Sequence, residues 1–219
     1  EITTRLVGSE MCIRDRANLT VDELLELIGK CTDQRMFAMY EAIARGVTLE
    51  KLHEITKIDY FFLHKYLNLY NMECRLKEGN IDAETYLRAK KMGYPDKAIE
   101  RLSGEKVPMH RDPVYKMVDT CAAEFAAETP YFYATYDDEN EAKEFLDERP
   151  KKPCVVVLGS GPIRIGQGIE FDYASVHCVW MLKQAGYDVV MINNNPETVS
   201  TDFDTADRLY FEPLTAEDV

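Results

Sequence analysis

Closely spaced cysteines are missing from this chain of 219 residues. Its six cysteines form no CxxC or CxxxC pair, and its four histidines stand apart from one another. Structural zinc sites normally take their ligands from such pairs, so we expect no metal site. Reduced and mostly buried thiols in a cytoplasmic protein are the interpretation we favour.

Long apolar runs are also lacking. No stretch approaches the roughly 18 consecutive apolar residues of a membrane helix, and no signal-peptide pattern is visible. Basic residues are outnumbered, 26 against 39 acidic ones, which gives a formal charge of −13. Because phosphate-rich partners require a basic surface, we expect no nucleic acid and no membrane as a partner. A local phosphate site made from backbone N–H groups remains compatible with this charge.

What the chain does contain is typical of a globular protein with one large or two small domains: 46% apolar and 30% charged residues. The first sixteen residues, EITTRLVGSEMCIRDR, fit no periodic pattern and look like translated library-adapter sequence. We interpret residues 1–16 as a spurious or disordered leader.

Residues 17–104 predict an all-α domain, because apolar positions recur at helical spacing between start and stop signals. The six expected helices have the following start and stop residues, in chain order: Thr20 (a capping box with Glu23) to Gly29; Asp33 to Gly46; Thr48, with no stop residue named; Asp59 to Gly79; Asp82 to Gly93; and Asp96 to Gly104. In the second helix Met36, Phe37, Tyr40, Ile43 and Ala44 are expected on one side. The aromatic segment YFFLHKYLNLY, residues 60–70, is interpreted as core packing, with a partner-facing stripe as the alternative.

Residues 105–153 change in character, since five prolines interrupt them and tyrosines are frequent. They predict an extended connector that wraps a neighbouring domain. Its charged stretch, DDENEAKEFLDERPKK, is interpreted as a solvated linker that is partly helical.

Residues 154–219 predict a truncated α/β domain of Rossmann-like type. A fully buried strand at 155–158 precedes the loop GSGPIRIGQG and a helix that Gly186 closes. The apolar stripe of that helix is expected at Phe171, Ala174, Cys178, Met181 or Leu182, and Ala185. Strands at 188–192 and 208–214 follow, and then a capping pattern from Thr215 to Asp218. Three strands make a poor sheet, so we expect truncation at both ends.

The glycine loop brings free N–H groups and a helix N-terminus to one point, where an anion could bind. A dinucleotide site is disfavoured by three details. Arg164 stands where GxGxxG requires its third glycine, Pro162 lacks an N–H, and residues 193–195 are asparagines where a ribose-binding acid is expected. The loop also lacks GK[ST] and is no Walker A motif.

Two long strings, PIRIGQGIEFDYA and NNNPETVSTD, closely resemble the start of the second synthetase half of the carbamoyl phosphate synthetase large chain. Both halves of that family carry versions of them. The segment VYKMVDTCAAEFAAETPYFYATY resembles the entry into the second half, and the helical region is similar to the family's oligomerisation domain. The resemblance covers nearly everything after residue 16.

The resemblance implies a glutamine-dependent ligase that makes carbamoyl phosphate from bicarbonate, glutamine nitrogen and two MgATP. It implies a small glutaminase subunit as partner and self-association through the helical domain. MgATP, with Mg²⁺ or Mn²⁺, would be bound by an ATP-grasp domain that begins after Val219. No catalytic or cofactor-binding residue is then expected within this chain. Its last part would be a pre-ATP-grasp domain, and the chain alone would be inactive.

By motif match, the glycine loop comprises Gly159, Gly161, Arg164, Gly166, Gln167 and Gly168. The resemblance implies that Gly168, Glu170 and Glu197 line a tunnel for carbamate. The alternative is that both acids lie near the positive ends of the helices that follow them. Ser160 and Ile163 depart from the family loop GGGPNRIGQG, and Ile163 cannot make the hydrogen bonds of asparagine.

Three competing functions remain open at this point. Another ATP-grasp ligase is disfavoured by the helical region and by the string VDTCAAEF. An autonomous helical interaction module fused to a dinucleotide-binding half-domain would require affinity for NAD. A purely structural scaffold is the weakest of the three.

Overall fold

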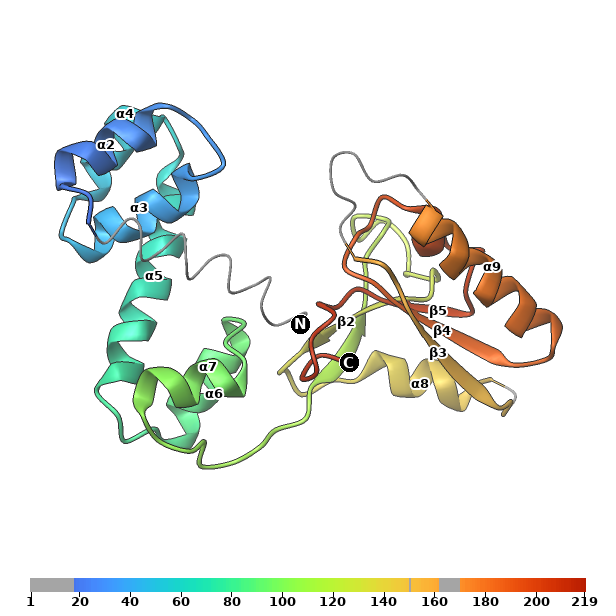
Figure 1. The fold of residues 1–219 in the computed structure, drawn as a ribbon. Coiled ribbons are helices and arrows are strands. Elements are labelled where there is room, and N and C mark those ends of the chain that lie inside the picture. The colour runs from blue at the N-terminus through green and yellow to red at the C-terminus, as the bar shows by residue number, and fades with distance from the viewer. Residues whose placement is uncertain (1–17, 150, 162–169) are drawn as a thin grey trace. The chain divides into compact units, whose positions relative to one another are not determined.

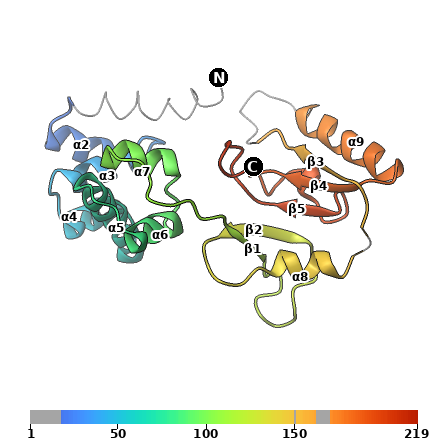
Figure 2. The ribbon, with the colours of Figure 1, turned by 90° about the horizontal axis from the view of Figure 1, so that it is seen from below.

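The computed structural model describes residues 18–149, 151–161 and 170–219. The chain divides into two compact units, Glu1–Met109 and His110–Val219. Figures 1 and 2 show a helical unit in blue to green and a unit built on a sheet in yellow to red. This agrees with the predicted combination of a helical domain and an α/β domain. Over the part of the chain that the structure describes, no helix has the length and apolar character needed to cross a membrane.

The helical unit contains the six predicted helices. They are α2 (Val21–Gly29), α3 (Arg35–Ala44), α4 (Leu49–Thr56), α5 (Tyr60–Lys77), α6 (Ala83–Lys91) and α7 (Asp96–Ser103). The Thr20–Glu23 capping box is present in full, and Thr48, Asp59 and Asp82 accept hydrogen bonds from the first turns of their helices. Gly104 ends α7 with φ of 73°, a left-handed conformation that favours glycine.

The start of α3 differs from the prediction. Gln34 rather than Asp33 precedes the first helical residue, without a side-chain cap. Met36 and Phe37 are 60% and 42% exposed, whereas Ala38, Met39, Ala42 and Ile43 face the core. The predicted stripe was therefore wrong for Met36 and Phe37 and right for Ile43, because apolar residues lie on both sides of this helix.

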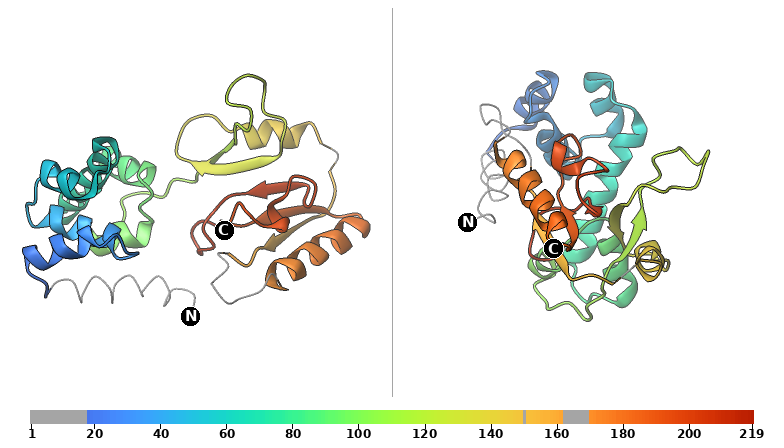
Figure 3. Two further views of the ribbon diagram at one scale, coloured as in Figure 1. Left: turned by 90° about the horizontal axis from the view of Figure 1, so that it is seen from above. Right: turned by 90° about the vertical axis from the view of Figure 1, so that its right-hand side faces the viewer.

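The second unit is a five-stranded mixed sheet in the order β1-β2-β5-β4-β3. Its elements are β1 (Val114–Met117), β2 (Tyr131–Thr135), α8 (Glu141–Asp147), β3 (Cys154–Leu158), α9 (Glu170–Gln184), β4 (Asp188–Ile192), the 3-10 turn η1 (Val199–Thr201) and β5 (Arg208–Tyr210). β1 pairs with β2 in antiparallel orientation. The other three pairs, β2 with β5, β5 with β4 and β4 with β3, are parallel. Helices α8 and α9 lie on opposite faces, as Figures 1 and 3 show.

The segment predicted as an extended connector, residues 105–153, contributes β1, β2 and α8 to this sheet. Tyr131 and Phe132 of β2 pair with Leu209 and Tyr210 of β5. The partner strand lies more than seventy residues further along the chain, so local sequence patterns did not reveal the pairing.

The strand β3 is an edge strand and alternates between exposed and half-buried residues. Val156 and Leu158 are 52% and 51% exposed, so the prediction of a fully buried strand was wrong. Adjacent β4 is buried from Val189 to Ile192. The run VVVL is apolar on both faces, and sequence alone could not show that one face lacks a cover.

The orientation of α9 differs from the prediction, although Leu182 of the predicted stripe does pack against the core. Val176 and Val179 are buried against the sheet, whereas Phe171 and Met181 of the predicted core stripe are 62% and 63% exposed. The thiols differ from the prediction as well, since Cys31, Cys154 and Cys178 are exposed. The closing role of Gly186 is confirmed by its φ of 90°.

Candidate functional site

The predicted site lies where β3, β4 and β5 end, because the carboxyl ends of parallel strands meet at one edge of the sheet. Gly159 follows β3, and its N–H donates to the carbonyl of Ile192 at 2.8 Å. Asn193 follows β4, and its N–H donates to the carbonyl of Tyr210 at 3.1 Å. These bonds extend the strand pairing beyond the sheet and hold both residues side by side.

Asn193 is the organising residue of this edge and is fully buried. Its Oδ1 accepts from the backbone N–H groups of Gly161, Asn194 and Asn195 at 3.2, 2.9 and 3.4 Å. Its Nδ2 donates to Ser200 Oγ at 3.3 Å. One side chain thus joins the glycine loop, the asparagine turn and η1, and every polar atom of its amide has a partner.

The predicted glycines are needed for close approach to this asparagine. A Cβ atom at Gly159 would lie 2.5 to 2.8 Å from three side-chain atoms of Asn193, closer than real atoms come. Gly161 has φ of 71°, a conformation that side chains disfavour. The sequence singled out both glycines as positions where an anion could approach the backbone, and the structure shows a side chain beside Gly159.

Asp172, on the first turn of α9, fixes the helix to this edge. Its Oδ2 accepts from the backbone N–H of Ser200 at 3.1 Å, and the side chain is buried. Its Oδ1 is buried without a hydrogen-bond partner among the described residues. Sequence reasoning missed both Asp172 and Asn193. The available signals were an asparagine directly after a buried strand and an acid within the first turn of the next helix.

Glu170 and Glu197, the predicted wall residues, are both exposed. Glu170 is the first residue of α9, and the N–H of Glu197 donates to Asn195 Oδ1 at 3.1 Å. The Asp172–Ser200 bond brings the segments that carry them to the same end of the sheet. The other predicted loop residues, Arg164, Gly166, Gln167 and Gly168, lie outside the described residues.

This geometry bears on what the site can hold. In a dinucleotide site, glycines let a pyrophosphate approach the backbone N–H groups. Here the amide oxygen of Asn193 already accepts from the N–H of Gly161 in the glycine loop, and its side chain fills the space over Gly159. Within residues 18–149, 151–161 and 170–219, no group of three or more His, Cys, Asp and Glu could hold a metal ion. The described part of this edge is held by hydrogen bonds to the side chains of Asn193 and Asp172.

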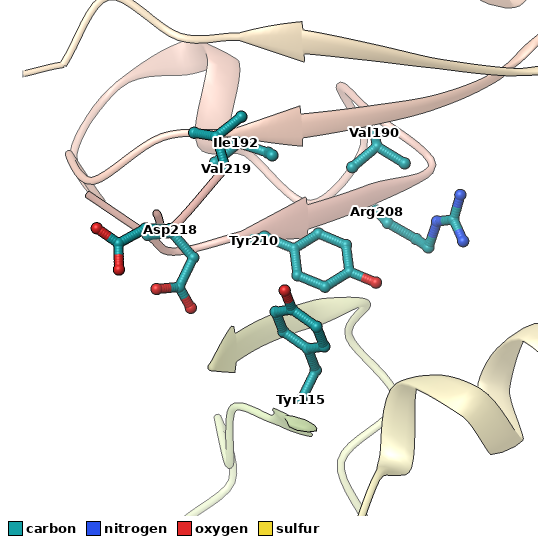
Figure 4. Close-up of a pocket in the computed structure, with 8 residues that line it drawn as sticks. Tyr115, Val190, Ile192, Arg208, Tyr210, Asp218 and Val219 are labelled. Carbon is teal, nitrogen blue, oxygen red and sulfur yellow. The ribbon is translucent and has the colours of Figure 1, made fainter. Parts of the chain in front are cut away.

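Figure 4 shows a separate hollow, of about 240 Å³, beside β4 and β5. It is lined by Tyr115, Tyr210, Arg208 and Glu212, among others. The buried Arg208 forms an ion pair with the half-buried Asp188, and burial raises the pKa of both Tyr210 and Glu212. The carboxylate of Glu212 accepts from the N–H of Ala134, so it ties the ends of β2 and β5 together.

Comparison with protein families gives two matches. A family model described as the carbamoyl-phosphate synthetase large chain, oligomerisation domain, matches residues 4–117, more than half of the chain. A second, described as the carbamoyl phosphate synthase preATP-grasp domain, matches residues 151–219. The second match includes the residues that meet at the edge around Asn193, namely Gly159, Gly161, Asp172, Asn193 and Ser200.

Proposed function

Because the chain belongs to the carbamoyl phosphate synthetase large-chain family, we propose that it works in glutamine-dependent synthesis of carbamoyl phosphate. The reaction proposed uses bicarbonate, glutamine nitrogen and two MgATP, with a glutaminase subunit as partner. The observation that carries this proposal is the succession, in one chain, of two domains of that family.

The proposed role of the helical unit is self-association. Its family model is described as an oligomerisation domain. Phe61 and Phe62, at the start of α5, are 60% and 57% exposed, while Leu63 beside them is fully buried. The aromatic segment that the sequence singled out is therefore divided between core and surface, and its exposed pair offers apolar area for a contact.

The proposed role of the sheet unit is to form a wall along which carbamate passes, at the edge formed around Asn193. Rigidity supports this role, since the asparagine amide and the Asp172 carboxylate fix the backbone there. Glu170 and Glu197 stand exposed on these fixed segments. A carboxylate in such a position would accept hydrogen bonds from a neutral carbamic acid and repel competing anions.

The proposed place of MgATP, with Mg²⁺ or Mn²⁺, is an ATP-grasp domain rather than the glycine loop. Support comes from Asn193, whose amide oxygen takes the N–H of Gly161 and whose side chain fills the space over Gly159. In this proposal the described residues position the backbone of the edge and guide carbamate along it, while another domain binds the nucleotide.

The test uses a large chain that carries these residues together with an ATP-grasp domain and is mixed with the glutaminase subunit. Glu170→Gln and Glu197→Gln are compared with Glu50→Gln, a matched exposed acid in the helical unit. The ratio of carbamoyl phosphate formed to ATP hydrolysed is measured. We expect this ratio to fall several-fold in the first two variants, because carbamate escapes, and to stay constant in the third.

Two outcomes separate the parts of the proposal. Unchanged ratios in all three variants would remove the wall role of both acids and leave the family function intact. A complete lack of carbamoyl phosphate in the unsubstituted enzyme, with ATP and glutamine supplied, would contradict the proposed function itself.

A further inference from the structure

Asp172 is a buried carboxylate at the edge formed around Asn193, and it is 3% exposed. Among the described residues it forms no ion pair and accepts one hydrogen bond, from the N–H of Ser200 to Oδ2 at 3.1 Å. Its Oδ1 is buried without a partner there. A buried acid with an unused acceptor costs free energy, and proteins keep such costs mainly at functional sites. The cost points to a role for this carboxylate in the candidate site.

The position of Asp172 in the chain links it to both acids of the proposed wall. It is the third residue of α9, two residues after Glu170. Ser200 lies in η1, three residues after Glu197. The hydrogen bond between Asp172 and Ser200 thus joins the segments that carry the two acids across 28 residues of sequence. A negative charge is also favourable in the first turn of a helix, which offsets part of the cost of burial.

No second hydrogen bond between described residues joins the first turn of α9 to η1. Lys183, in the last turn of α9, donates to the carbonyls of Asp204 and Thr205 and so holds the far end of the helix. The polar contact that sets the separation of the two acids is therefore the one made by Asp172.

We propose that Asp172 is a positioning residue of the carbamate wall: its carboxylate holds Glu170 and Glu197 at a fixed separation, so that the two acids act as a pair. This inference rests on the proposed role of both acids. Carbamic acid carries N–H donors at one end and an O–H donor at the other, so two carboxylates held apart can accept from both ends at once. Positions in such a pair matter to about 1 Å. Asp172 itself is buried and does not touch carbamate.

The first experiment measures this separation in the 219-residue chain, without any reaction. Glu170→Cys and Glu197→Cys, in a variant without other cysteines, carry nitroxide spin labels, and electron paramagnetic resonance gives the distribution of the distance between the labels. In Asp172→Ala we expect this distribution to widen roughly twofold, because segments released from a hydrogen bond sample more conformations. The matched control is Val179→Ala, a buried core position on the same helix beyond its first turn. It should leave the width unchanged.

The second experiment uses the large chain with an ATP-grasp domain and the glutaminase subunit, and it measures the carbamoyl phosphate formed per ATP hydrolysed. We expect this ratio to fall several-fold in Asp172→Ala, as in Glu170→Gln. Asp172→Asn should keep most of the ratio, because its amide oxygen can still accept from the N–H of Ser200. Val179→Ala controls for lost stability, since it removes core contacts and should leave the ratio constant.

A double-mutant comparison distinguishes positioning from a general loosening of the fold. If the two acids act as a pair, Asp172→Ala already removes the pair, and Glu170→Gln added to it should lower the ratio no further. A carboxylate that only stabilised the unit would lower the ratio independently, and the two losses would multiply. Multiplied losses would therefore contradict the inference.

Failure of the inference and failure of the proposed function give different results. If Glu170→Gln and Glu197→Gln lower the ratio and Asp172→Ala does not, the inference is wrong and the wall role stands. An unchanged distance distribution in Asp172→Ala also overturns the inference, whatever the ratios are. Should Asp172→Ala not fold, Asp172→Asn decides: a loss equal to that of Glu170→Gln contradicts the inference. Constant ratios in both glutamate variants remove the wall role and the inference together.

Discussion

The caps that begin helices in the helical unit and the contacts that join the loops of the sheet unit differ in how far they reach along the sequence. In the helical unit, Thr20, Thr48 and Asp82 each hold a backbone group three residues away. In the sheet unit, Asn193 reaches Gly161 across 32 residues and Asp172 reaches Ser200 across 28. Short-range contacts set where helices begin, whereas long-range contacts set which segments meet. A substitution that removes one of these long-range contacts should therefore cost more than one that removes a helix cap.

The largest effect is expected for Asn193→Ala. The change leaves several backbone N–H groups without their acceptor, and an unsatisfied buried donor costs about 1–3 kcal/mol. We expect the free energy of unfolding of the sheet unit to fall by about 3 kcal/mol. Trp180, the chain's single tryptophan, reports on this unit during denaturant unfolding.

The control for this substitution is Asn194→Ala, at the exposed neighbouring position. It should change the unfolding free energy by less than about 0.5 kcal/mol. Similar losses for the two variants would mean that Asn193 is not the organising residue, and the contrast between the units would disappear.

Gly159→Ala should have the next largest effect, about 2 kcal/mol, because its Cβ would overlap the side chain of Asn193. Gly29→Ala in the helical unit is the matched change, and there the nearest atom to the new Cβ lies at 3.8 Å. We expect that variant to be neutral or slightly more stable. A double-mutant cycle with Asn193→Gly tests the cause: the cost of Gly159→Ala should shrink when the overlapping atoms are removed.

The smallest effect is expected for Thr20→Ala, which removes the capping box of α2. Loss of such a cap costs about 1 kcal/mol, and the circular dichroism signal during denaturant unfolding should show it. Glu26→Ala, an exposed position on the same helix, is the control. A loss at Thr20 that equals the loss at Asn193 would contradict the ranking of local below long-range contacts.

Sequence reasoning succeeded where the cause of a structure is local. The caps at Thr20, Thr48, Asp59 and Asp82 and the left-handed glycines Gly104 and Gly186 require only neighbouring residues, and all are confirmed.

Sequence reasoning failed where two orientations fit the same pattern. Helix α9 is apolar nearly all round, so periodicity could not decide which side faces the sheet. The hairpin of β1 and β2 was missed because its place in the sheet depends on β5.

The candidate site was predicted in part. Gly159 and Gly161 do stand at positions that favour glycine, and the ends of β3 and β4 lie side by side as expected, while the site itself stays a prediction. The partner that fills the space beside them, Asn193, could not be predicted, because its contact joins loops from two strands. The wall role of Glu170 and Glu197 stays a prediction.

The position of β5 has a consequence for the order in which the chain can fold during synthesis. This strand lies between β2 and β4, yet follows both in the sequence. The hairpin of β1 and β2 and the pair of β3 and β4 therefore wait as separate pieces until residues 208–210 have left the ribosome. At about 5–20 residues per second, the helical unit is synthesised several seconds earlier and can already be folded. Until β5 arrives, chaperones would meet two unpaired strand edges of this unit.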